Sequence, residues 1–207
     1  MSDGTLDPAQ ALRIVEQQQR AVTTRLGAFV PVMTAAWGVA WLLGFGALFA
    51  SEVAGLPLWI AIAVFVVLLL VAGGVSTWLG IRAGRGIRAT KHTTFTGTVY
   101  GATWSFGSVA LAGIGGGLAY NGMSGELASH FYPSAFLFFT GIMYILAGAI
   151  WPTVFTVVTG GQLVLIAVVS LFIPAPFHLL FLALAGGAGF LVLALLHRLS
   201  QKRARNG

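Results

Sequence analysis

The stretch GAIWPTVF, residues 148–155, decides the fold because it interrupts a long apolar run. From residue 131 to residue 177 the sequence contains no Asp, Glu, Lys or Arg, a length of 47 residues. One helix needs about 20 apolar residues to cross a bilayer, so this run is about twice one span. Pro152 lacks a backbone N–H and disfavours helix at Trp151, although proline suits the first turn of a new helix. Two membrane-spanning helices are therefore predicted here.

The rest of the chain is equally apolar. Hydrophobic residues make up 57% of the 207 residues, and the mean hydropathy is +0.91. Such a composition leaves too little polar surface for a soluble globule. We expect an all-α, polytopic membrane protein with six transmembrane helices in one transmembrane domain, residues 27–197. The predicted spans are about 27–50, 57–80, 97–120, 133–150, 153–173 and 177–196.

All eleven Lys and Arg residues fall on one side of this six-helix map. They precede the first span, join the second to the third, or follow the sixth. The other side receives Glu52 and Glu126. Because cytoplasmic loops carry the excess of Lys and Arg, both termini and residues 81–96 are predicted to be cytoplasmic in a multi-pass protein of the plasma membrane. A single span over 133–173 would put the basic tail outside, against this rule.

The two terminal segments are predicted to be cytoplasmic. Residues 1–26 have the pattern of a short amphipathic helix, with Asp7 as its cap and Pro8 in its first turn. Its apolar stripe and flanking cations favour the inner membrane surface, and docking of a partner or second copy is the alternative. Residues 198–207 form a basic tail.

Four cations lie close together between the second and third spans: Arg82, Arg85, Arg88 and Lys91. Near an anionic leaflet each contributes about 1 kcal/mol of attraction, so anionic lipid headgroups are the expected partner. A separate cytoplasmic ATPase is the alternative. Nucleic acid is not expected, because these cations stand between long apolar runs without interleaved aromatic residues.

Small residues recur at helical spacing within the spans. Such residues allow close helix approach in membranes, where packing holds helices together. We predict that they pack within one chain; a lumen or a homo-oligomer seam is the alternative. The residues concerned are Ala36, Ala40, Gly44, Gly113, Gly117 and Gly187.

Ionisable residues are absent from the middle of every predicted span. Carriers that couple to protons or ions usually place such a residue near the midplane, so a self-energised transporter is disfavoured. Hydroxyl and amide groups at Thr156, Thr159 and Gln162 are the candidates for a polar pathway. For Gln162 a hydrogen bond between helices is the alternative.

The predicted outer side collects Glu52, Glu126, His130 and His178. Carboxylates and imidazoles can bind zinc, but these residues lack the local spacing of a metalloenzyme and come from three loops. We expect a solvated set of loops, with neither a metal nor a cofactor.

A short motif resembles part of a protease family. Gly122-Met123-Ser124-Gly125 lies before the fourth span and His178 opens the sixth, an order similar to the Ser-His dyad of rhomboid intramembrane proteases. That resemblance implies Ser124 as nucleophile and His178 as base. The chain lacks the family's Trp-Arg loop pair and its helix-two His and Asn, and Phe181 stands where a glycine normally follows the histidine.

A broader likeness covers most of the chain. It rests on ALRIVEQQQRAV (11–22), WGVAWLLGFGALF (37–49), LPLW (56–59) and PAPFHLLFLALAGGAGFLV (174–192). These segments resemble small six-span actinobacterial membrane proteins of unestablished function, often labelled transporters. The resulting expectation is a transporter or permease-like subunit without its own energy source. A membrane scaffold or regulatory protein is the main alternative, and an intramembrane protease is the minor one.

Overall fold

The computed structural model describes residues 10, 13, 29–84 and 90–206, and within these ranges the regular structure is entirely helical. The predicted N-terminal helix, 1–26, lies outside the described residues except for Gln10 and Arg13, which are helical. Arg85 and Arg88 also lie outside them. The elements are α2 (Val30–Val53), α3 (Leu58–Gly84), α4 (Lys91–Tyr120), α5 (Gly125–Ile150), α6 (Val154–Ser170), α7 (Phe177–Phe181), the π-helix η1 (Leu182–Ala188) and α8 (Gly189–Asn206).

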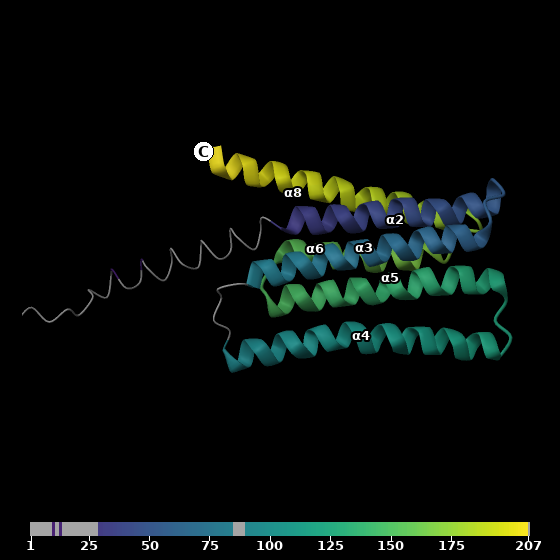
Figure 1. The fold of residues 1–207 in the computed structure, drawn as a ribbon, viewed down its shortest axis with the longest axis horizontal. Helices are drawn as coiled ribbons and strands as arrows, with labels where there is room; N and C mark the ends of the chain where they lie inside the picture. The colour runs from purple at the N-terminus through teal and green to yellow at the C-terminus, as the bar shows by residue number, and fades with distance from the viewer. Residues whose placement is uncertain (1–9, 11–12, 14–28, 85–89, 207) are drawn as a thin grey trace, which may run out of the picture.

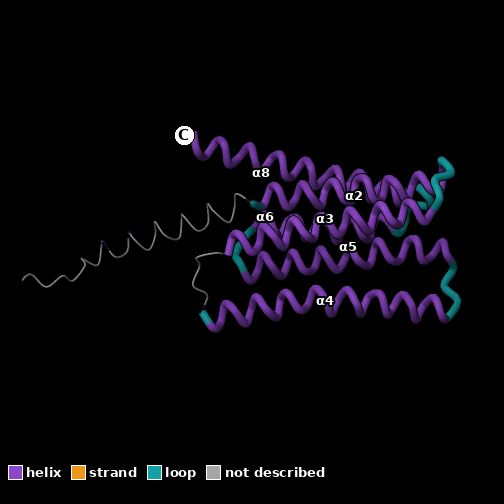
Figure 2. Tube along the Cα trace, viewed as in Figure 1, coloured by secondary structure: helices purple, strands orange, loops and turns teal. Residues whose placement is uncertain are grey.

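Successive helices run antiparallel in an elongated bundle (Figure 1). The start of α2, the end of α8 and the α3–α4 connection lie at one end, which we call the basic end. It carries Arg82, Lys91, Arg198, Lys202 and Arg203. Short turns join the helices at the opposite end (Figure 2), where Glu52 and Glu126 lie. Ionised side chains of the two signs are thus separated along the bundle axis in the described part of the chain.

Four helices are long and apolar enough to cross a membrane: Val30–Val53, Leu58–Arg82, Gly125–Ile150 and Phe177–Arg203. The apolar helix α6 has 17 residues and is therefore about 26 Å long, slightly less than the hydrocarbon thickness. The 30 residues of α4 are long enough, but Thr, Ser and Gly lower its hydropathy, and the predicted span 97–120 is not among the four. These helices are compatible with a multi-pass integral membrane protein.

The break at Pro152 is confirmed, since α5 ends at Ile150 and α6 begins at Val154. The predicted start of the preceding helix, at Pro133, is wrong. That helix begins at Gly125, because the Ser124 hydroxyl accepts a hydrogen bond from the Leu127 N–H at 3.1 Å and caps it. Pro133 consequently lies inside α5.

Glycine sets the closest helix contacts. A Cβ at Gly160 of α6 would lie 2.5 Å from the carbonyl oxygen of Gly141 in α5, and one at Gly187 of η1 would meet the backbone of Leu42 in α2. Ala40 is buried, Ala36 packs against the core, and Gly44 lies against the Phe65 ring. These predicted small-residue positions therefore do lie at packed sites.

The prediction of intramolecular packing fails for Gly113 and Gly117 in α4. No described atom lies within 4 Å of a Cβ placed at either residue. The packed glycines of α4 are instead Gly107, against Phe139, and Gly115, against Tyr132. Residues two apart on a helix point to nearly opposite sides, so Gly113 and Gly117 face away from α5.

Candidate ligand-binding groove

A groove lined by aromatic side chains separates the α2–α3 pair from the α4–α5 pair. It consists of two adjoining cavities of about 450 and 400 Å³, whose walls share Trp37, Trp41, Trp104 and Thr140. These shared residues lie near the middle of their helices. If the helices cross a bilayer, the groove lies in its apolar interior.

Helix pairing explains why the groove exists. The helix α3 packs against α2, and α4 packs against α5, whereas α3 and α4 are not packed together along their lengths. Side chains from all four helices therefore line the space between the pairs. Figure 1 shows α4 at the edge of the bundle, next to α5.

The α2 wall comes from one face of that helix. Trp37, Trp41 and Phe45 are spaced four residues apart, so their side chains lie on the same side. The Trp41 ring stacks on Phe190 of α8, with ring centroids 4.9 Å apart. The Trp37 indole N–H donates to the Ser76 hydroxyl of α3 at 3.0 Å. These contacts hold both indoles in place.

Polar groups in the groove are few, and some already have protein partners. The Tyr100 hydroxyl donates to the Met143 carbonyl oxygen at 2.9 Å, and the Thr140 hydroxyl donates to that of Phe136 at 2.8 Å. The Trp41 indole N–H and the Tyr144 hydroxyl have no hydrogen-bond partner among the described residues. Both can donate to an acceptor oxygen of a bound molecule.

The three predicted pathway residues do not come together. Thr156 lines the groove. Thr159 is buried and donates to the carbonyl oxygen of Phe155 in its own helix, and Gln162 is exposed elsewhere on α6. Within the described residues, Gln162 makes no hydrogen bond to another helix. Sequence reasoning missed the groove tryptophans, although the four-residue spacing of Trp37 and Trp41 was a signal of a shared face.

The predicted outer-face residues do come together, contrary to the expectation of separate solvated loops. Glu52, Glu126 and His178 line one cavity of about 300 Å³, which we call the acidic-end pocket. The His130 ring stacks on His178, with centroids 3.8 Å apart and planes inclined by 19°. Among the described residues, no three His, Asp or Glu side chains are arranged to bind a metal ion.

The geometry of Ser124 differs from that of a nucleophile held by a base. Its hydroxyl caps α5, and His178 Nε2 lies 3.1 Å from the Ser129 carbonyl oxygen. Ser124 and His178 share no hydrogen bond in the described structure. The two residues expected from the rhomboid resemblance are therefore not paired with each other.

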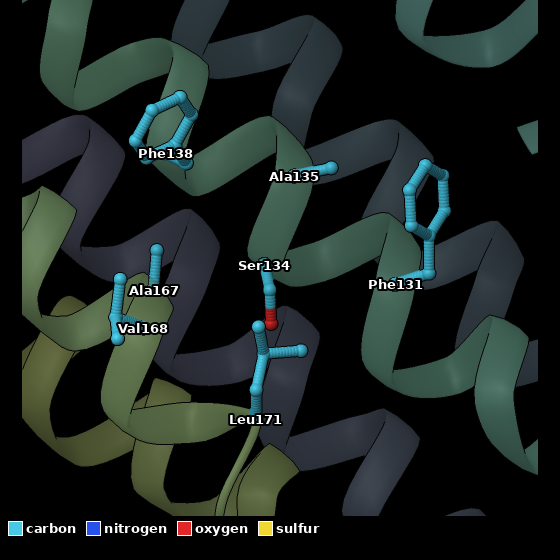
Figure 3. A pocket seen from close by; sticks show the side chains of 7 residues that line it. All are labelled: Phe131, Ser134, Ala135, Phe138, Ala167, Val168 and Leu171. Carbon is cyan, nitrogen blue, oxygen red and sulfur yellow. The ribbon is translucent and has the colours of Figure 1, made fainter. Parts of the chain in front are cut away.

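A shallow apolar depression between α5 and α6 is the remaining hollow of note (Figure 3). Its volume is about 210 Å³, and Ser134 contributes the hydroxyl seen there. That hydroxyl is bonded to the Ser170 hydroxyl at 2.8 Å, and Ser170 donates to the Ala167 carbonyl oxygen. The polar groups are thus used in holding α5 to α6.

The predicted inner-face cations are described only in part. The Arg82 guanidinium lies 5.3 Å from the centroid of the Trp78 ring, within the range of a cation–π contact. Lys91 is exposed in the first turn of α4. Both residues lie at the basic end of the bundle, together with the C-terminal cations.

Comparison with known proteins finds no matching family model, no similar curated protein and no similar solved structure. The groove and the acidic-end pocket are therefore the observations from which a function can be inferred.

Proposed function

We propose that this is a six-span membrane protein that binds an apolar or amphipathic molecule of the bilayer in the groove. Its role would be that of a permease-like subunit for lipid-soluble substrates, without an energy source of its own. The observation that carries this proposal is the groove itself, with its tryptophan walls at the middle of the helices. Known ligand sites have similar volumes, roughly 300–1,000 Å³, and similarly apolar, aromatic linings.

Size and chemistry both favour a long hydrocarbon chain with one polar group. Along α2 the groove extends from Met33 to Leu48, which corresponds to about 22 Å of helix. No ionised side chain lines either cavity, so an ion or strongly polar solute would lose its hydration without compensation. The free donors of Trp41 and Tyr144 suit a carbonyl, carboxyl or hydroxyl oxygen.

The proposed orientation places the basic end in the cytoplasm. It follows from the separation of charge along the bundle and from the positive-inside rule. In this arrangement α4 and α6 also cross the membrane. The less apolar α4 is then tolerated because it is long and packs beside α5, and the short α6 because a bilayer thins at modest cost.

Cysteine labelling in this naturally cysteine-free chain tests the orientation. We expect an impermeant maleimide to label Glu126→Cys in intact cells and Lys202→Cys only after permeabilisation, since the two exposed positions lie at opposite ends. Labelling efficiency is measured by gel shift. Labelling of Lys202→Cys in intact cells would reverse the proposed orientation.

Ligand binding is tested by blocking the groove. Ser108 lines the wider cavity, whereas Ser105, three residues earlier on α4, is exposed and outside it. We expect Ser108→Trp to weaken binding of a fluorescent fatty acid by about tenfold or more, equivalent to 1.4 kcal/mol. Ser105→Trp, the matched control, should bind like the parent. The measurement is energy transfer from tryptophan to cis-parinaric acid in detergent or nanodiscs, with each variant calibrated for its extra indole.

Two results would contradict a ligand-binding groove. One is fluorescence that rises without saturation in the parent, as expected for probe partitioning into lipid. The other is equal loss of affinity in Ser105→Trp and Ser108→Trp, which would show an effect on the helix rather than on the groove.

A scaffold role is the second candidate, and one observation favours it. The face of α4 that is turned away from α5 carries glycines with no described atom within 4 Å of an added Cβ: Gly97, Gly101, Gly113 and Gly117. Open glycines on a membrane helix suit close approach by another helix. In that case Gly113→Leu and Gly117→Leu would abolish co-purification of a partner or second copy while fatty-acid binding persists.

A further inference from the structure

The acidic-end pocket is built by three segments that are far apart in sequence. Glu52 lies in the last turn of α2, Glu126 in the first turn of α5 and His178 in α7. Both carboxylates are exposed, whereas His178 is only 1% exposed. Two acidic groups thus stand at the mouth of a pocket whose wall includes a buried imidazole.

Hydrogen bonding fixes the state of His178. Its Nε2 lies 3.1 Å from the Ser129 carbonyl oxygen, and a carbonyl can only accept, so Nε2 carries a hydrogen. In the neutral ring Nδ1 is then an acceptor. This Nδ1 is buried and has no hydrogen-bond partner. A buried acceptor without a donor costs about 1–3 kcal/mol, so a donor from a ligand would be stabilising.

His130 holds the imidazole of His178 but does not compete for the ligand. Its Nδ1 and Nε2 lie 3.0 Å from the carbonyl oxygens of Glu126 and Ile173, respectively. Its ring covers one face of His178. The acceptors left for a ligand are therefore His178 Nδ1 and the carboxylates of Glu52 and Glu126.

We propose that the acidic-end pocket binds a protonated primary amine. An ammonium group has three N–H donors and one positive charge, which match one imidazole acceptor and two carboxylates. A metal ion is less suitable, since the described residues provide no set of three metal-ligating side chains. The amine is either a free solute or the ethanolamine headgroup of a lipid, because both present the same ammonium group.

The test follows the nitrogen resonances of His178 in ¹⁵N-histidine-labelled protein. The protein is placed in phosphatidylcholine nanodiscs and titrated with ethylamine, and His178→Gln assigns the signal. A saturable shift of Nδ1 is expected. Tetramethylammonium, which has the same charge but no N–H donor, should give no such shift.

A double variant, Glu52→Gln with Glu126→Gln, keeps the shape of both exposed side chains and removes their charge. It should weaken ethylamine binding by about tenfold or more. Nanodiscs containing phosphatidylethanolamine distinguish the two sources. If they produce the Nδ1 shift without added amine, the headgroup is a ligand; if only ethylamine produces it, the ligand is a free amine.

Three outcomes would overturn the proposal: no saturable Nδ1 shift with any amine, equal shifts from ethylamine and tetramethylammonium, or unchanged affinity in the double variant. None of them bears on the groove, since the groove-blocking variant lies on α4 and does not line this pocket.

Discussion

Gly160→Ala is expected to destabilise the protein by about 2–3 kcal/mol, as a methyl group forced into a closely packed contact does. The new Cβ would lie 2.5 Å from the Gly141 carbonyl oxygen and 2.7 Å from the Ile145 backbone nitrogen. Both atoms belong to the backbone of α5 and cannot turn aside as a side chain would. The two helices must therefore move apart along the seam that joins them.

The neighbouring glycine provides the control. No described atom lies within 4 Å of a Cβ at Gly161, so Gly161→Ala adds the same methyl group to the same helix without a clash. Its stability should match or slightly exceed that of the parent, since alanine favours helix over glycine. The measurement is reversible unfolding in mixed micelles, followed by circular dichroism. Equal stability of the two variants would show that the α5–α6 seam is looser than described.

Trp41→Ala should be the most damaging tryptophan substitution, with a loss of about 3 kcal/mol or more. Trp41 is 7% exposed and stacks on Phe190, so its removal leaves a void between α2 and α8. Even among apolar helices, where little hydrophobic transfer energy is involved, the lost packing contacts weaken helix association.

Trp59→Ala is the matched comparison. Trp59 is 71% exposed on α3, and its loss should change stability by less than about 0.5 kcal/mol. Thermal aggregation of the purified variants, measured under identical detergent conditions, gives the ranking. Comparable melting temperatures for both alanine variants would mean that the indole of Trp41 is not part of the core.

The helices could be predicted where a local rule decides them. Pro152 ends one helix and starts another whatever its surroundings, because the missing N–H is a property of the residue. The start of α5 was harder, since two local signals competed. Pro133 favours a first turn, but it is also tolerated where Ser124 has already capped a helix and apolar packing continues it.

The sites could not be predicted in the same way, because they depend on how each helix is rotated. Spacing shows that Gly113 and Gly117 share a face, and equally that Gly107 and Gly115 share one. It does not show which face meets α5. The convergence of Glu52, Glu126 and His178 likewise depends on the relative heights of α2, α5 and α7, which no local pattern encodes.

The two seams of α5 differ mechanically. Toward α6 it meets backbone directly, at Gly141 and Gly160, whereas toward α4 it presents the flat rings of Phe139 and Tyr132 to the smooth surfaces of Gly107 and Gly115. A ring resting on a glycine resists compression but offers little resistance to sliding. The α4 wall therefore has a softer support than the α6 wall, and lateral pressure from the surrounding acyl chains acts directly on its outer side. The width of the groove is in this sense a property that the protein shares with its bilayer.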